Sequence, residues 1–227
     1  MASSRSEFFS GVKAQLPLVV GVVPFGLIYG ALAVQLNVPP SIAQAMSLII
    51  FAGSAQFIAI PLIAAATPGI IVMLTVFVVN LRHALYSASV APYLKELHPL
   101  WKILLAYLLT DEAYAVAIAH YRTGSAFRNE HWYFLGTGVT LWAFWQASTA
   151  FGIFIGAQVP RNWSLDFALP LTFIALVVPM IKNRAYVFAA LVAGGVGVLT
   201  IGLPYQFGLL LASLCGIAAG MAVRAED

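Results

Sequence analysis

One long uncharged stretch limits how this chain can fold. From Ala14 to Leu81 the sequence contains no Asp, Glu, Lys or Arg. Further apolar runs of about 17 to 26 residues follow, and a helix of that length crosses about 30 Å of hydrocarbon. The 227 residues are 62% hydrophobic and only 8% charged, whereas a soluble domain averages about 25% charged. The pattern predicts an all-α, polytopic integral membrane protein whose surroundings are the lipid bilayer. A β-barrel would show short alternating segments instead.

Turn signals divide the chain into about eight predicted transmembrane spans. They are placed at residues 15–36, 41–66, 69–94, 99–120, 132–157, 164–181, 185–202 and 205–223. The second contains Gly53-Ser54-Ala55-Gln56 and Pro61, so it is a candidate broken or re-entrant helix. Seven spans are the alternative. All are assigned to a single transmembrane domain covering 1–227, with a cytoplasmic N-terminus at 1–14 and a C-terminal tail at 224–227.

The basic residues predict the orientation of these spans. With eight spans, seven basic residues lie on the side of the N-terminus and three lie on the other side. The seven are Arg5, Lys13, Arg122, Arg128, Lys182, Arg184 and Arg224, and the three are Lys95, Lys102 and Arg161. This excess predicts that both termini are cytoplasmic. Because the basic residues are scattered, no nucleic-acid partner is expected. With the single Cys215, no cysteine metal motif is expected either.

Glycine spacing suggests close helix packing and an internal repeat. Pairs at four-residue spacing occur at Gly26–Gly30, Gly152–Gly156 and Gly216–Gly220, and such pairs let helices approach closely. The segment 26–31 is similar to 152–157, which makes spans 1–4 and 5–8 a candidate two-fold repeat. Transporters are often built from such repeats, with the site at the repeat interface.

Charges at the centres of two predicted spans indicate function. Arg82 lies near the middle of 69–94, and Asp111 and Glu112 lie near the middle of 99–120. Facing lipid, the two acids would cost about 5–7 kcal/mol, more than the roughly 3–4 kcal/mol that the apolar residues of that span return. Arg82, at a similar depth on the neighbouring span, is the expected partner of one acid. Successive helix residues point about 100° apart, so the other acid is expected to face a cavity or carry a proton. A purely structural ion pair is the alternative.

Several polar and aromatic residues join these charges as candidates. The candidate residues for binding substrate or protons are Arg82, Asp111, Glu112, His83, Asn80, Tyr86, Gln56, Ser54, Trp145, Gln146 and Asp166. Tyr86 shares a helix face with Arg82, and Asn80 does not. For Ser54 and Gln56 the alternative is interhelical hydrogen bonding, and for Asp166 it is an acid in the first turn of a helix. His98, His120 and His131 are expected at a solvated surface.

At these residues the chain resembles the AzlC family of branched-chain amino acid permeases, over nearly all of 11–223. The resemblance rests on Val23-Pro24-Phe25-Gly26 with Tyr29-Gly30, Phe51-Ala52-Gly53-Ser54-Ala55-Gln56-Phe57, Asn80-Leu81-Arg82-His83-Ala84-Leu85-Tyr86, Thr110-Asp111-Glu112-Ala113-Tyr114, Trp145-Gln146 with Thr149, and Leu165-Asp166-Phe167. It implies a bacterial cytoplasmic-membrane exporter of valine, leucine and isoleucine, with methionine as a further candidate. It also implies a small AzlD-like partner subunit and drive from the proton gradient.

Other functions follow less directly from the residues. The same site would serve amino acid uptake as well as export, and central charges also fit an ion or proton channel. Gly53-Ser54 with His83 faintly resembles an intramembrane serine protease, but no Gly-x-Ser-x-Gly element is present. We therefore predict a transporter and not an enzyme, with no cofactor and no metal.

Overall fold

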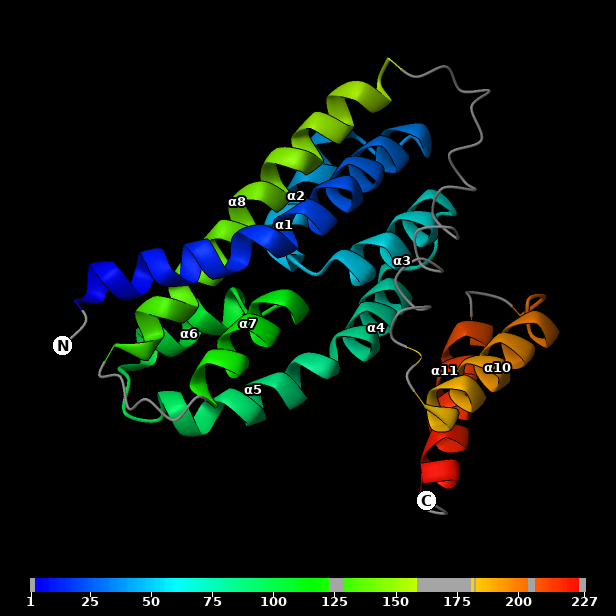
Figure 1. Cartoon of the computed structure of the whole chain (residues 1–227). Coiled ribbons are helices and arrows are strands. Elements are labelled where there is room, and N and C mark those ends of the chain that lie inside the picture. Colours follow the sequence, from blue (N-terminus) through cyan, green and yellow to red (C-terminus); the bar gives the residue numbers. More distant parts are fainter. Residues whose placement is uncertain (1–2, 123–128, 159–180, 182, 204–206, 225–227) are drawn as a thin grey trace. The chain divides into compact units, whose positions relative to one another are not determined.

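The computed structural model describes residues 3–122, 129–158, 181, 183–203 and 207–224. They belong to two compact units, Met1–Trp163 and Ser164–Asp227, each of which is considered by itself. The described residues form helices and no strands, as predicted for a helical membrane protein (Figure 1). In the first unit the helices are α1 (Ser4–Gln35), α2 (Pro40–Ile50), α3 (Gly53–Ala64), α4 (Gly69–Asn80), α5 (Arg82–Leu94), α6 (Pro99–Tyr107), α7 (Asp111–Tyr121) and α8 (Glu130–Gly156).

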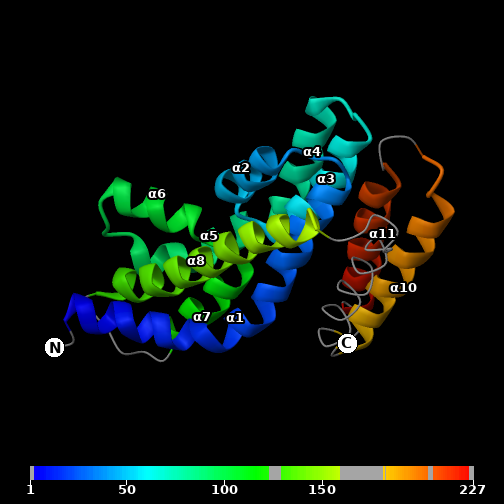
Figure 2. The same ribbon diagram turned by 90° about the horizontal axis from the view of Figure 1, so that it is seen from above.

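The centre of the first unit is a parallel pair of long helices, α1 and α8 (Figures 1 and 2). Gly11 of α1 lies against Tyr133, and Gly30 lies against Gly152. Because the residue numbers rise together along both helices, the two run in the same direction. A Cβ atom on Gly30 would overlap the backbone of α8, so the missing side chain permits this close approach. We call the end where α1 and α8 begin the N-side and the opposite end the C-side.

This pair accounts for two features of the sequence. The similar segments 26–31 and 152–157 pack directly on each other, because Gly156 lies against Ala31 as well. The rest of the candidate repeat falls partly on residues outside the described ranges. Helix α1 also begins earlier than the predicted span, at Ser4, where Ser3 accepts a hydrogen bond from Ser6 N and caps the helix.

Helices α2 and α3 form a broken hairpin, hairpin A. Tyr29 of α1 contacts both arms: its hydroxyl donates to Ala43 O at 2.9 Å, and its ring centroid lies 5.9 Å from that of Phe57. The arms meet at Phe51, which has a left-handed backbone with φ 38°. Hairpin A starts at the C-side end of α1, reaches the middle of the unit and returns to the C-side.

Helices α6 and α7 form a second broken hairpin, hairpin B. Both of its ends contact the beginning of α8. The Trp101 ring centroid of α6 lies 5.0 Å from that of Trp132, and the Tyr121 hydroxyl of α7 donates to Glu130 O at 3.1 Å. Between α6 and α7 the helix is interrupted at 108–110. Hairpin B therefore enters from the N-side and returns to it, opposite in direction to hairpin A.

Helices α4 and α5 connect the two hairpins by crossing from the C-side to the N-side. The Tyr86 ring stacks on Tyr114 at 4.5 Å and the Tyr93 ring lies 4.9 Å from Tyr121, so α5 runs beside α7 toward the N-side. A bend of 42° separates α4 from α5 at Leu81. Among the described helices, α1 and α8 are each long and apolar enough to cross a membrane, and α4 with α5 is a third such element if the bent pair forms one span.

The hairpins change the path expected for two segments. The broken helix expected within 41–66 is present, and its form is re-entrant. The segment 99–120 was expected to cross the membrane once, but it turns back at its midpoint. As a result Lys95 and Lys102, expected opposite the N-terminus, lie on the N-side, where Lys102 Nζ donates to Lys95 O at 2.7 Å. Sequence periodicity missed this turn because no Gly or Pro marks 108–110.

The described part of the second unit is an antiparallel helix pair, α10 (Arg184–Leu199) and α11 (Phe207–Arg224). Gly216 of α11 lies against Ala193, and Gly220 lies against Ala189 one turn earlier. The third predicted glycine pair is therefore an intramolecular contact. Asn183 accepts a hydrogen bond from Tyr186 N at 3.0 Å and caps α10, as a short polar turn at this point predicts.

Candidate functional site

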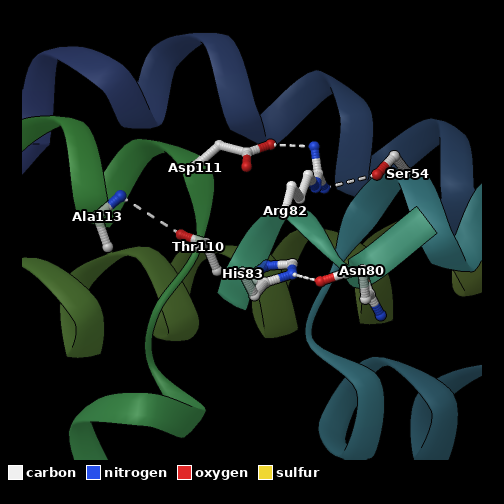
Figure 3. Close-up of polar contacts among 7 residues, drawn as sticks. All are labelled: Ser54, Asn80, Arg82, His83, Thr110, Asp111 and Ala113. Atoms are coloured by element: carbon white, nitrogen blue, oxygen red, sulfur yellow. Dashed lines mark hydrogen bonds and ion pairs between the residues drawn. The ribbon is translucent and has the colours of Figure 1, made fainter. Parts of the chain in front are cut away.

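A helix break places Arg82 in the middle of the membrane-crossing pair α4–α5. Asn80 ends α4 and Arg82 begins α5, so the break interrupts the regular backbone ladder at Leu81. The ring of His83 takes the place of a backbone partner at the break, because its Nδ1 lies 3.1 Å from the carbonyl oxygen of Asn80 (Figure 3). A side chain inserted into the ladder is a recognised cause of helix bending. His83 therefore supports the bend.

Arg82 bridges the tips of the two hairpins. Its Nη1 donates to Asp111 Oδ2 of hairpin B at 2.5 Å, and its Nη2 donates to Ser54 Oγ of hairpin A at 2.6 Å (Figure 3). The Arg82 and Asp111 side chains keep 31% and 39% of their surface exposed, so a solute could reach the pair. Within the described residues, the buried Arg82 Nε has no hydrogen-bond partner. One donor of the guanidinium is thus unused, and it is buried.

Two helix N-termini meet at this arginine. Helix α3 begins at Gly53 with no side-chain cap, and α7 begins at Asp111, with Thr110 accepting a hydrogen bond from Ala113 N at 3.4 Å. Helix N-termini carry partial positive charge. The acids of α7 offset this charge at hairpin B, but hairpin A has no acid in its first turn. The electrostatics therefore favour an anion beside Arg82 and α3.

The two acids behave as helix geometry predicts. Asp111 takes the ion pair with Arg82, while Glu112 is one residue further along α7 and points about 100° away. Tyr86 of α5 lies within interaction distance of Asp111, on the Arg82 side of α7. In contrast, the side chain of Asn80 points away from Arg82 (Figure 3).

An aromatic wall stands behind the tip of hairpin A. The Trp145 ring stacks on Tyr29 at 6.3 Å, and its Nε1 donates to Gln56 Oε1 at 3.2 Å. A Cβ atom on Gly53 would lie 2.9 Å from the Trp145 ring, so the glycine makes room for the indole. Trp145 and Gln56 are both buried. The wall is therefore a packed apolar support for the tip of hairpin A, next to Ser54.

Gln146 belongs to a different polar cluster, which ties hairpin A to α8. Its Oε1 accepts from Gln44 Nε2 at 2.8 Å, and its Nε2 donates to Ser47 O at 3.0 Å. Ser47 Oγ and Thr149 Oγ1 are 3.3 Å apart in the same contact. These hydrogen bonds join helices and do not reach Arg82. Asp166, the last candidate, lies outside the described residues.

Sequence reasoning missed two sets of contacts. Tyr107, at the end of α6, donates to Leu48 O at 2.5 Å and accepts from Trp142 Nε1 at 2.8 Å, which fixes the two tips against each other. His120, expected at a solvated surface, lies 3.9 Å from the buried Glu7. Both sets of contacts join residues that are far apart in the sequence, so no local sequence pattern predicts them.

Two cavities lie near the hairpins, and neither includes Arg82. One, of about 360 Å³, runs between α5 and α6 and ends at Leu109, next to the hairpin B tip. The other, of about 520 Å³, follows the opposite side of α7. Among the described side chains no group of three or more His, Cys, Asp or Glu is placed to hold a metal ion. Neither of these cavities therefore forms a ready-made pocket at the Arg82–Asp111 pair.

Comparisons with known proteins identify the family of this chain. The sequence profile described as AzlC protein matches residues 17–159. Inner membrane protein YgaZ of Escherichia coli (strain K12) is 30% identical over 96% of this chain and 90% of its own length. An uncharacterized membrane protein of Archaeoglobus fulgidus is 32% identical over 94% of each chain. The branched-chain amino acid transport protein AzlC of Bacillus subtilis is 24% identical over 86% of this chain and 76% of its own length. No solved structure matches significantly.

The family profile covers more than half of the chain, and it includes both hairpins, the arginine between them and α8. The relatives extend the similarity over almost the whole length. The chain is therefore a helical membrane protein that belongs to the AzlC family.

Proposed function

We propose that this chain is a secondary transporter that exports branched-chain and related apolar amino acids across the bacterial cytoplasmic membrane. Valine, leucine and isoleucine are the expected substrates, with methionine as a further candidate. The observation that carries the proposal is the position of Arg82, which lies at the break between α4 and α5 and bridges the tips of two oppositely directed hairpins. A relative named as a branched-chain amino acid transport protein supports the substrate class.

The chemistry of the site suits a zwitterion with an apolar side chain. Arg82 and the uncapped N-terminus of α3 provide donors and positive charge for a carboxylate. Asp111 provides a carboxylate for an ammonium group. Trp145 and Phe57, which are buried behind the tip of hairpin A, would provide apolar surface for the side chain when that tip moves. Each part of a leucine or valine molecule therefore has a counterpart within the same small region.

The mechanism we propose begins with an exchange of partners on Arg82. The substrate carboxylate replaces Asp111 on the guanidinium, and Asp111 turns to the ammonium group. Because hairpin A opens to the C-side and hairpin B to the N-side, movement of one tip at a time would expose the site to one side only. Broken helices at a midplane site are a recurring design for alternating access.

The charge distribution supports an orientation with the N-terminus in the cytoplasm. Arg5, Lys95, Lys102 and Arg122 are on the N-side of the first unit. The C-side turns at 36–39 and 65–68 contain no charged residue. Basic residues accumulate on the cytoplasmic side of membrane proteins. We also propose that both termini are cytoplasmic, that the proton gradient drives export and that a small AzlD-like subunit takes part.

Efflux from intact cells tests the proposal. Cells expressing the chain are preloaded with labelled leucine, valine or methionine, and loss of label is followed with and without a co-expressed small partner subunit. Saturable efflux that falls when the proton gradient is collapsed is the expected result. Non-saturable flux of ions would favour the alternative of a channel, and accumulation of label from the medium would favour an uptake permease. Either result would overturn the exporter proposal.

A further inference from the structure

Helix α7 presents its two acids to different sides of the first unit. Asp111 faces Arg82 on α5, whereas Glu112 is turned away by about 100°. Val116 follows Glu112 by one helical turn, and His120 follows it by two turns. Residues at these spacings lie on the same side of a helix. Glu112 and His120 therefore mark the two ends of one side of α7.

An open groove of about 520 Å³ follows this side of α7. Its lining residues are Ala115, Val116, Ala119 and His120 of α7, Leu18 of α1 and Tyr133 of α8. Successive residues of a helix point about 100° apart. Ala115 and Ala119 therefore lie on one side of the direction in which Glu112 points, and Val116 and His120 lie on the other side. The groove thus runs from His120 to Ala115 along the side of α7 that does not face Arg82, and Glu112 lies beyond its lining, closer to the hairpin tip.

A buried acid and a histidine form the N-side end of the groove. Glu7 Oε2 of α1 lies 3.9 Å from His120 Nε2, and Glu7 is only 6% exposed. The His120 ring stacks on Tyr133 of α8, with centroids 3.8 Å apart and planes 7° from parallel. A buried carboxylate is costly unless a positive group pairs with it. Protonated His120 is such a group. The other titratable residues around this pair are Tyr121 on α7, Glu130 on α8 and Tyr93 on α5.

We infer that the Glu112 side of α7 is a proton route, separate from the amino acid site on the Arg82 side. This inference rests on the proposed proton-driven transport. Glu112 accepts a proton at the hairpin tip and releases it to water in the groove, giving hydronium. His120 takes up a proton at Nε2, the Glu7 carboxylate stabilises the resulting imidazolium, and the imidazolium returns the proton to water on the N-side. Only O–H and N–H bonds are made and broken.

The separation of the two ends determines how the proton travels. Glu112 and His120 are eight residues apart, which is roughly 12 Å along the helix axis. This distance is too long for direct transfer, so water in the groove has to carry the proton. One helix thus couples both events, because any movement of hairpin B at Asp111 also moves Glu112.

Two fluxes measured in the same proteoliposomes separate the route from the amino acid site. The first is leucine transport driven by a pH gradient. The second is exchange of labelled for unlabelled leucine without a gradient, which needs no net proton movement. The full chain is reconstituted, together with the partner subunit if export in cells needs it. The variants are Glu7→Gln and His120→Gln, and the matched controls are Glu96→Gln and His98→Gln, whose side chains are exposed at the N-side turn.

We expect Glu7→Gln and His120→Gln to lower gradient-driven transport at least about tenfold, while exchange stays within about twofold of the wild type. The two controls keep both fluxes. Gradient-driven transport at the wild-type level in both variants would overturn the proton route. Equal loss of both fluxes would also overturn it, because the pair would then be purely structural. If the wild type shows neither flux, the proposed function fails first and the route fails with it.

Discussion

Arg82 and Asp111 are joined across 29 residues of sequence by an ion pair of 2.5 Å, and each is the first residue of a helix that follows a break. The pair therefore couples the bend of the α4–α5 span to the tip of hairpin B. Since Arg82 also holds Ser54, three interrupted helical elements depend on one guanidinium. In the mechanism we propose, this side chain acts on both the binding of a solute and the closure of the hairpins.

Two substitutions of Arg82 distinguish the role of its positive charge from the role of its planar shape. Arg82→Ala should abolish leucine efflux, because no group remains to hold a carboxylate between the hairpins. Arg82→Lys keeps the charge but lacks the planar fork that reaches Ser54 and Asp111 together. We expect it to lower efflux by roughly 10- to 100-fold, a loss of about 1.4–2.7 kcal/mol. Efflux is normalised to the amount of protein in the membrane. Wild-type efflux by Arg82→Ala would contradict the site.

The coupling between Arg82 and Asp111 can be measured directly. Asp111→Asn should abolish efflux while the protein still reaches the membrane. If the pair works as a unit, the double variant Arg82→Ala/Asp111→Asn should lose no more thermal stability in detergent than the less stable single variant. The melting temperature is measured for all four proteins of the cycle. Losses that add up would show that the two residues act independently.

Cysteine accessibility tests the hairpin arrangement. Cysteines are placed singly at Ala65 and Glu96, in a chain whose exposed Cys215 has been replaced by serine. With two re-entrant hairpins, Ala65→Cys on the C-side should react with a membrane-impermeant maleimide in intact cells. Glu96→Cys on the N-side should react only after the cells are opened. Modification is read as a shift in gel mobility.

Eight simple crossings predict the reverse of this labelling pattern. In that arrangement the turn at 65–68 lies in the cytoplasm and the turn at 95–98 lies outside. Labelling of Glu96→Cys in intact cells, with protection of Ala65→Cys, would therefore contradict hairpins A and B. A cysteine at Asn37 serves as control, because both arrangements place it outside.

Two glycines of α1 test the helix pairing. A side chain at Gly30 would overlap the backbone of α8, whereas no atom lies within 4 Å of a Cβ on Gly21. Gly30→Leu should destabilise the protein by about 1–3 kcal/mol, since overpacking forces the helices apart. The melting temperature in detergent should fall by roughly 3–10 °C. Gly21→Leu is the matched control and should melt like the wild type. Equal melting of the two variants would contradict the close parallel contact.

The sequence allowed some of these features to be predicted. Charges in the middle of apolar runs must find partners, and residue spacing put Arg82 at the depth of the acids. The angle between neighbouring helix residues showed that only one acid could pair with it. The structure selects Asp111. The irregular segment around Ser54 was also expected from its Gly-Ser composition.

Other features depend on contacts that no local pattern reveals. Just before the break of hairpin B at 108–110, Tyr107 forms hydrogen bonds with Leu48 and Trp142, residues far away in the sequence. The apolar run from 99 to 120 is long enough to cross the membrane, so its length alone favoured a single span. His120 is near a helix end, where solvent exposure is the usual outcome, but the early start of α1 brings Glu7 beside it.

The parallel contact between α1 and α8 has a consequence for biosynthesis. Gly30 is synthesised long before Gly152, so α1 is surrounded by lipid, without its main packing partner α8, until α8 has been made. Meanwhile both hairpins are made without the surface on which they will fold. The first unit can close only when the ribosome has passed the end of α8. Premature termination before that point would leave the polar hairpin tips in the membrane without the helix that covers them. We expect quality-control proteases to degrade such products.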